Sequence, residues 1–146
     1  MTVYTASRSI KQPQEVIFDL VADVERYPEF LPLWKCARII GRDGNTYATE
    51  QMVGFGPVRE RFRTKTVLVR PTLIEVTSTD RLFRNFFIRW DLDSAAEGCR
   101  VGIALRWEVR SRILQKAIDL VLPETAEKMI DSFERRAAAG HLGRRP

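Results

Sequence analysis

One long amphipathic segment near the C-terminus, residues 112–138, constrains the fold more than any other part of the sequence. On a helical wheel, one largely apolar stripe spans about 140°, and Lys116, Glu127 and Glu134 lie on the other side. The stripe comprises Leu114, Ile118, Val121, Leu122, Thr125, Ala126, Met129 and Phe133. Because this segment follows a run of strands, we expect a helix laid across the concave face of an antiparallel sheet. Such a fold can enclose an apolar cavity, so binding of a hydrophobic molecule is a leading hypothesis.

Alternating segments separated by turn residues precede this helix and predict the sheet. The breaks between them are too short for crossover helices, which favours antiparallel hairpins. The expected strands cover residues 3–10, 33–41, 46–54, 57–70, 73–79, 84–93 and 99–109. The clearest apolar faces, which we expect to point inward, are formed by Phe86, Ile88, Trp90 and Leu92 and by Val101, Ile103, Leu105, Trp107 and Val109.

Two helical pieces are expected between the first and second strands. The first begins with Pro13 in its first turn, and its apolar face consists of Val16, Ile17, Leu20, Val21 and Val24. The stretch 26–32 contains two prolines and predicts a short helical turn or loop, anchored by Tyr27, Phe30 and Leu31. The whole pattern indicates an α+β fold in one domain, residues 1–146, with residues 139–146 as a flexible tail.

Composition excludes several classes of protein. Of the 146 residues, 45% are hydrophobic and 29% charged, and no apolar run approaches the roughly 18–20 residues of a membrane span. The first residues show no secretory signal, so we expect a bacterial cytoplasmic protein or an already processed organellar one. His141 is the only histidine, which excludes a His-based triad or a multi-His metal site within one chain. We expect no metal and no catalytic cofactor.

Four segments in a fixed order give the chain a family resemblance. They are residues 18–32 followed by Trp34 and Cys36, residues 53–62, residues 81–83 followed by Trp90, and residues 128–137. Through them, nearly the whole chain resembles the coenzyme Q-binding family of START-like, helix-grip domains, also labelled polyketide cyclase/dehydrase. One departure is Leu33, which stands between Pro32 and Trp34 where many relatives have proline followed directly by tryptophan.

The resemblance implies a curved sheet of about seven strands around a hydrophobic tunnel that the C-terminal helix closes. It implies ubiquinone as the bound ligand, because mitochondrial members bind it and are needed for efficient respiration, as quinone chaperones rather than enzymes. It implies a second function as well, because a bacterial branch is described as a ribosome-association toxin acting on the large subunit. The motifs do not separate these two branches.

A quinone with a long isoprenoid tail needs an apolar channel for the tail and an aromatic surface or a few donors for the head group. Each buried CH₂ contributes roughly 0.8 kcal/mol, so the tail can drive binding without polar contacts. Plain core packing is the alternative role for each apolar side chain. The candidate ligand-binding residues are Phe30, Leu31, Trp34, Phe55, Phe62, Phe83, Phe86, Trp90, Trp107, Val121, Leu122, Thr125, Met129 and Phe133.

Four cations alternate with other residues along the strand expected over 57–70 and fall on one of its faces. They are Arg59, Arg61, Arg63 and Lys65, and we call them the basic ridge. The chain carries a net charge of +5, and the ridge is the candidate contact surface for an anionic membrane or for ribosomal RNA. A solvated outer face of the sheet is the alternative interpretation.

The function we expect is binding of ubiquinone or a prenylated precursor as a lipid carrier that supports respiration or quinone biosynthesis at the bacterial inner membrane. Its partners would be the lipid itself and, transiently, an anionic membrane surface. One alternative is a ribosome-association toxin-like module that binds the large ribosomal subunit and inhibits translation. Another is an aromatic cyclase-type enzyme. Acid–base catalysis would require acidic side chains paired on one face, and the spacing of the acidic candidates does not pair them in this way. These candidates are Glu50, Glu60, Glu75, Asp91 and Glu108.

Overall fold

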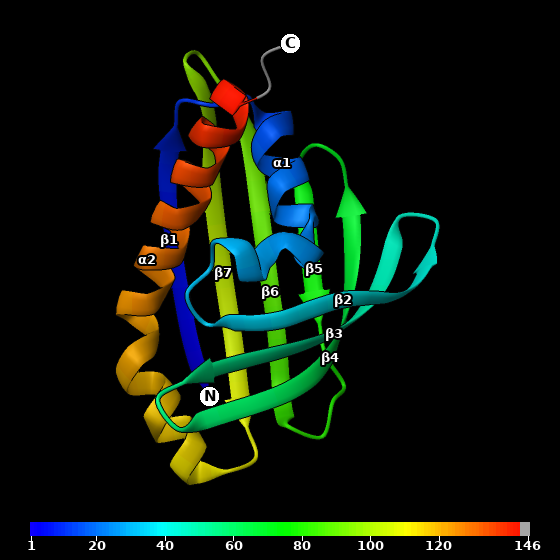
Figure 1. Cartoon of the computed structure of the whole chain (residues 1–146), viewed down its shortest axis with the longest axis vertical. Coiled ribbons are helices and arrows are strands. Elements are labelled where there is room, and N and C mark those ends of the chain that lie inside the picture. The colour runs from blue at the N-terminus through cyan, green and yellow to red at the C-terminus, as the bar shows by residue number, and fades with distance from the viewer. Residues whose placement is uncertain (144–146) are drawn as a thin grey trace.

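The structure, a computed structural model, describes the backbone of residues 1–143 and the side chains of residues 1–139 except those of Phe55 and Leu122. Its elements follow the expected order, with a strand, two helical pieces, six strands and a long helix (Figure 1). They are β1 (Thr2–Ile10), α1 (Gln14–Ala22), the 3₁₀ helix η1 (Val24–Glu29), β2 (Trp34–Asp43), β3 (Thr46–Phe55), β4 (Val58–Val69), β5 (Leu73–Thr77), β6 (Phe83–Ala95), β7 (Gly98–Val109) and α2 (Arg112–Gly143).

The seven strands form one antiparallel sheet in the order β1-β7-β6-β5-β4-β3-β2. Only the placement of β1 beside β7 departs from a simple meander, and it joins the first strand to the last. Gly44 and Gly56 adopt φ values of 60° and 54° at the turns after β2 and β3, a conformation that glycine allows without steric cost. The expected α+β fold with a curved antiparallel sheet and a C-terminal helix is confirmed.

The inward faces of the central strands agree with their alternation. In β6 and β7 the residues expected to point inward are buried or half-buried, and Leu92 is fully buried. In β4 the same alternation holds, with Phe62, Thr64 and Thr66 buried. Period-two patterning is a local property of an extended chain, so these faces can be predicted from sequence.

The short helices pack one end of the sheet. Pro13 is the N-cap of α1 rather than a residue of its first turn, and Ile17, Phe18 and Val21 are the buried side chains. Phe18 is therefore part of the core although it was outside the expected apolar face. In η1 the buried residue is Val24. These side chains join the main core cluster or a smaller one next to it.

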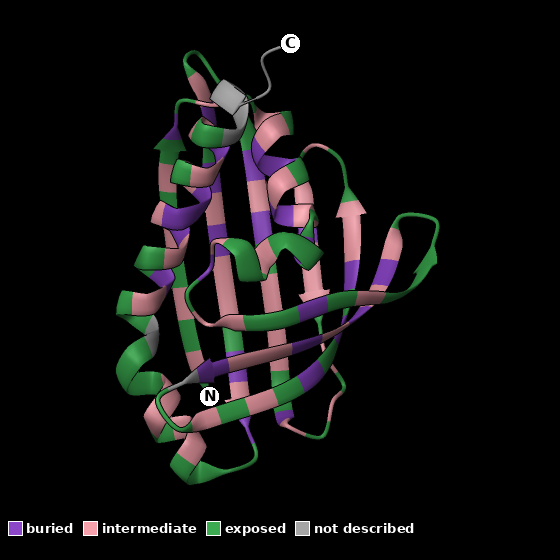
Figure 2. Cartoon of the chain, viewed as in Figure 1, coloured by how far each residue is buried: buried purple, intermediate pink, exposed green. Residues whose placement is uncertain are grey.

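The long helix α2 lies against the concave side of the sheet, and its two halves differ in burial (Figure 2). In the C-terminal half Ala126, Ile130, Phe133 and Ala137 are buried. In the N-terminal half Val121 of the expected stripe is 37% exposed. The buried stripe is thus displaced toward Ile130 and Ala137 relative to the prediction, because the core lies under the later turns. The helix also continues to Gly143, so the expected tail is helical from 139 to 143, and residues 144–146 lie outside the described part.

A single cation on β1 ties α2 to the sheet. Arg8 shares the inward face of β1 and contacts three carboxylates on successive turns of the helix. The nitrogen–oxygen distances are 3.2 Å to Glu127, 2.5 Å to Asp131 and 3.3 Å to Glu134. One guanidinium with several donors can serve all three, which orients α2 along β1.

Candidate functional site: an apolar pocket under the C-terminal helix

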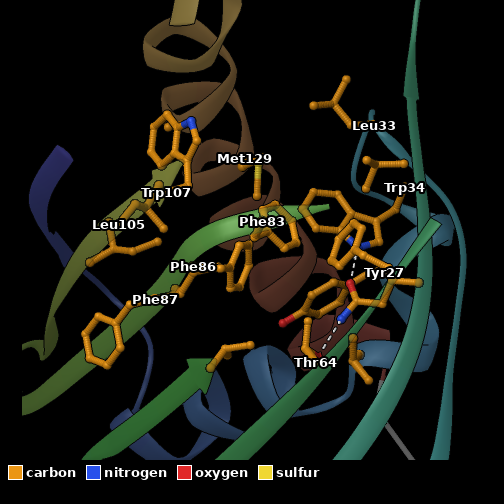
Figure 3. A pocket seen from close by; sticks show the side chains of 18 of the residues that line it. Tyr27, Leu33, Trp34, Thr64, Phe83, Phe86, Phe87, Leu105, Trp107 and Met129 are labelled. Atoms are coloured by element: carbon orange, nitrogen blue, oxygen red, sulfur yellow. Dashed lines mark hydrogen bonds between the residues drawn. The ribbon is translucent and has the colours of Figure 1, made fainter. Parts of the chain in front are cut away.

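The sheet and α2 enclose a pocket with a volume of about 210 Å³ (Figure 3). Its walls come from every strand except β1, from α1, from η1 and from the pocket side of α2. Apolar and aromatic side chains predominate, which is the usual composition of a site for a small hydrophobic molecule. The half-exposed Val121 belongs to this wall, so the pocket opens toward solvent beside the N-terminal half of α2.

Most of the candidate ligand-binding residues lie on this wall. Those that line the pocket are Trp34, Phe62, Phe83, Phe86, Trp90, Trp107, Val121, Met129 and Phe133. Phe30, Leu31 and Thr125 do not line it. Phe30 packs edge-to-face on Phe133 behind the wall, and Leu31 is buried in the core. The side chains of Phe55 and Leu122 are outside the described residues.

Two sets of aromatic rings shape the wall. In one, Phe62, Phe83 and Phe86 lie with centroids 4.6–6.1 Å apart. In the other, the ring of Phe133 meets Trp90 and Tyr27 edge-to-face at 5.4 and 5.5 Å. Such pairs hold rings in fixed orientations, so these parts of the wall are rigid compared with the flexible side chain of Met129 on α2.

A polar network interrupts the apolar wall on the β2–β3–β4 side (Figure 3). The indole Nε1 of Trp34 donates to Gln51 Oε1 at 2.7 Å. The Gln51 amide nitrogen in turn donates to the hydroxyls of Thr49 and Thr64, at 2.9 and 3.3 Å. Those two hydroxyl oxygens are 2.5 Å apart. Trp34 lines the pocket, and so does Leu33, the residue before it.

This network was missed in the sequence because its members come from three strands. Thr64 and Thr66 were recognisable on the inward face of the ridge strand, and two polar residues on an otherwise apolar face are a signal. Gln51 comes close to Thr64 only through the pairing of β3 with β4, which the sequence pattern does not specify. The register of two paired strands depends on residues far apart in the sequence, so a local pattern does not predict it.

Two tyrosines, the buried Tyr47 and the half-buried Tyr27, brace the same end of the pocket. The hydroxyl of Tyr27 donates to the carbonyl of Val21, and that of Tyr47 donates to the carbonyl of Ala22 at 2.7 Å. Burial raises the pKa of Tyr47 to about 12 and raises the pKa of Tyr27 well above its usual value. Both phenols are therefore neutral, and they fix the end of α1 against the sheet.

Trp107 differs from the other polar side chains of the wall. Its indole Nε1 is buried and has no hydrogen-bond partner among the described residues. Most buried donors in folded proteins are paired. This donor is the one exception among the buried side-chain polar atoms that the structure describes.

The basic ridge is exposed on the outer face of β4, as its alternation predicts. One acid lies among its cations: Glu50 on β3 contacts Arg38, Arg61 and Arg63 at 3.1, 3.4 and 3.5 Å. Partial burial acts to raise the pKa of the Glu50 carboxyl, but the hydrogen bond from Arg38 and the charges of Arg61 and Arg63 lower it overall. The ridge is thus partly neutralised.

The described residues contain no group of three or more His, Cys, Asp or Glu side chains arranged to hold a metal ion. Over the same part of the chain, no helix combines the length and apolar character needed to cross a bilayer. Of the acidic candidates only Glu60 lines the pocket. It lies on β4 opposite Val53, close to the β3–β4 turn.

Comparison with known proteins gives the family. A family model described as polyketide cyclase/dehydrase and lipid transport matches residues 10–134, and the chain belongs to this family. It is 28% identical over 132 residues to the ribosome association toxin RatA of Pseudomonas aeruginosa, covering 90% of this chain and 92% of that protein. It is also 28% identical over 144 residues to the mitochondrial coenzyme Q-binding protein coq10 of Schizosaccharomyces pombe, covering 94% and 88%.

Solved structures agree on the fold. A START superfamily protein from Mycobacterium smegmatis superposes with a TM-score of 0.81 at 18% identity, covering 94% of this chain and 97% of the other. The Zhui aromatase/cyclase from a Streptomyces species gives a TM-score of 0.82 at 10% identity, covering 94% and 93%. At these identities the likeness shows the START-like fold alone.

Proposed function

We propose that this protein binds ubiquinone or a prenylated precursor in the pocket and carries it to respiratory or biosynthetic partners at the bacterial inner membrane. The observation that supports this most is the apolar, aromatic wall that the sheet and α2 form together. The mechanism is sequestration and transfer, with no bond made or broken. The coenzyme Q-binding name of the Schizosaccharomyces pombe relative supports a quinone as the ligand.

The test is organic extraction and mass spectrometry of the protein purified without detergent from a ubiquinone-producing bacterium. We expect a quinone or a prenylated precursor in stoichiometric amount. A Met129→Glu variant prepared in parallel controls for lipid that adheres to the outer surface, because the substitution puts a carboxylate inside the pocket. Equal lipid in both preparations, or none in either, would contradict the proposal.

A second candidate function is binding of the large ribosomal subunit. The basic ridge supports it, together with the ribosome association toxin name of the Pseudomonas aeruginosa relative. Contacts between cations and phosphates weaken steeply with salt. This candidate predicts co-sedimentation with the large subunit that falls as salt is raised, and it predicts loss of binding when Arg59, Arg61 and Arg63 are changed to Glu. Absence of co-sedimentation at low salt would eliminate it.

An aromatic cyclase is the weakest candidate. Its support is the Zhui aromatase/cyclase likeness, which extends only to the fold. Fold alone does not carry an activity from one protein to another. Glu60, close to the β3–β4 turn, is the sole carboxylate that the described pocket wall offers for acid–base work.

A further inference from the structure

The first turns of α2, residues 112–121, expose apolar side chains to solvent. Ile113 is 84% exposed and Leu120 is 85% exposed, the two highest values among the large hydrophobic side chains that the structure describes. Seven residues separate them, so they project from the same face of the helix. Figure 2 shows buried segments of α2 only further along the helix. Exposure of two large apolar side chains on one face is unfavourable in water, which indicates a surface that a partner covers.

The same turns form part of the pocket wall on their other side. Leu114, Ile118 and Val121 line the pocket. Val121 directly follows Leu120 and lies about 100° around the helix from it, between the exposed face and the wall. Its partial exposure marks the open end of the pocket. A partner that covers Ile113 and Leu120 would therefore also meet the mouth of the pocket.

Five exposed cations lie at this end of the molecule, where α2 and β6 begin and β7 ends (Figure 1). The backbone nitrogen of Arg110 donates to the carbonyl of Leu82 at 3.1 Å, which holds the β5–β6 loop beside the start of α2. Among the described residues, none of the five takes part in an ion pair. The five cations are Arg81, Arg84, Arg110, Arg112 and Lys116.

The acidic side chains next to the exposed face already have partners. Asp119 accepts hydrogen bonds from Thr2 and Gln115. Glu124 ends the apolar face and pairs with Lys128 at 3.0 Å. The charges still without a partner in the described part of this end are thus cations, whereas the basic ridge has a carboxylate among its cations.

We propose that the first turns of α2 dock on an anionic lipid bilayer, with Ile113 and Leu120 among the acyl chains and the five cations at the headgroups. This inference rests on the proposed function, because a carrier of a membrane lipid has to meet a bilayer. Apolar side chains flanked by Lys and Arg are the usual composition of a helix that lies in a membrane interface. A protein is the less suitable occupant, because specific interfaces bury about 800 Å² on each partner and this face offers only two large apolar side chains.

Vesicle sedimentation tests the apolar part of the face. Ile113→Ser and Leu120→Ser should each weaken binding to vesicles of phosphatidylcholine and phosphatidylglycerol about tenfold, because each removes an apolar side chain from the acyl region. Both positions are exposed, so the fold should be retained. Val69→Ser is the matched control: Val69 is 45% exposed at the end of β4, where the next residue, Arg70, bonds Asp19 of α1. It should bind like the parent protein.

The charges are tested in the same assay. Changing Arg112 and Lys116 to Glu should weaken binding to vesicles that contain phosphatidylglycerol, and the effect should shrink in high salt. Binding to vesicles of phosphatidylcholine alone should not change.

A fluorescent label reports insertion directly. In a Cys36→Ser background the remaining thiol, Cys99, is buried, so an environment-sensitive dye can be attached at Leu120→Cys alone. We expect its emission to shift to the blue when vesicles containing phosphatidylglycerol are added. The same dye at Val69→Cys should show no shift.

The outcomes separate this proposal from the proposed function. No shift at Leu120, or equal vesicle binding of the parent protein and the serine variants, would overturn the docking face and leave quinone binding intact. A parent protein that is dimeric without lipid, with a monomeric Leu120→Ser variant, would also overturn it, because a second copy would then cover this face. A dye shift in a protein that carries no extractable quinone would support the docking face and contradict the proposed function.

Discussion

Met129 is the most informative single position of the pocket. Its half-buried side chain comes from α2 and lines the pocket (Figure 3). Met129→Glu should abolish binding of a hydrophobic ligand, because an ionised carboxylate cannot share a dry cavity with an apolar tail. The open end of the pocket gives the carboxylate access to water, so we expect a cooperative thermal transition to remain.

The measurement is calorimetric titration with a short-chain ubiquinone, alongside thermal unfolding. Ala139→Glu, at an exposed position of the same helix, is the matched control and should bind normally. Retained binding in Met129→Glu would show that the ligand lies elsewhere.

Ionisation of Tyr47 should lower the stability of the folded protein at alkaline pH. Its pKa is raised to about 12 in the folded protein by burial, against about 10 in the unfolded chain. A raised pKa of this kind gives stability that is present below pH 10 and is lost as the pH rises toward 12. Between pH 9 and 11 the melting temperature of the parent should therefore fall more than that of Tyr47→Phe. Parallel pH profiles for the two proteins would contradict this.

Individual residues also show what sequence patterns can and cannot predict. Trp90 and Trp107 were assigned to an inward face correctly, because alternation within a strand is local. Leu31 was expected at the pocket and is in the core, since its position depends on how the segment after η1 folds back on the sheet. The role of Gln51 required the register of β3 against β4, which no local pattern contains.

Among the elements, α2 depends on its attachment to β1. Arg8→Ala removes the cation that three carboxylates share and leaves Glu127, Asp131 and Glu134 close together without a counter-charge. Because these side chains are partly exposed, we expect a loss of about 1 kcal/mol in the free energy of unfolding. Arg100→Ala on the outer face of the neighbouring β7 is the control. Denaturant titration of both variants measures the difference, and equal stabilities would rule out the anchoring role.

On β4, the positive charge of the basic ridge is partly neutralised by Glu50 on the neighbouring strand β3. Glu50→Gln should strengthen binding to anionic vesicles, because Arg38, Arg61 and Arg63 lose the carboxylate they share. Changing Arg61 and Arg63 to Glu should weaken it. Both effects should shrink in high salt. Vesicle sedimentation with anionic and zwitterionic lipids is the measurement, and identical binding of all variants would remove the ridge from the contact surface.

Elements were easier to predict than their contacts. Seven strands and the long helix follow from turn residues and periodicity, which act over a few residues. The buried stripe of α2 could not be located from its wheel, because which turns lie over the core depends on where the helix crosses the sheet. Ile130 and Ala137 are buried for that reason, while Val121 borders the open end of the pocket.

The molecule as a whole has a pocket that is small for the ligand proposed. Its volume of about 210 Å³ is below the roughly 300–1,000 Å³ of typical small-molecule sites. If ubiquinone is the ligand, we therefore expect a long isoprenoid tail to extend past Val121 into the surroundings. Since each CH₂ adds roughly 0.8 kcal/mol only where it is buried, affinity should rise over the first isoprene units and then level off.

A series of ubiquinones with one to four isoprene units, titrated below the concentrations at which they aggregate, measures this. A steady gain in affinity for every added isoprene unit would contradict this expectation and would mean that the pocket enlarges around the tail.

The open end beside Val121 has a consequence for how such a ligand is handled. A molecule held by its head and first isoprene units keeps the rest of its tail among the lipids of the bilayer, so loading does not require the whole tail to be extracted from the membrane. The length of that tail then limits how far the protein can move from the surface while still bound. Delivery would operate as a tethered exchange between neighbouring sites on one membrane, rather than as diffusion between separate membranes.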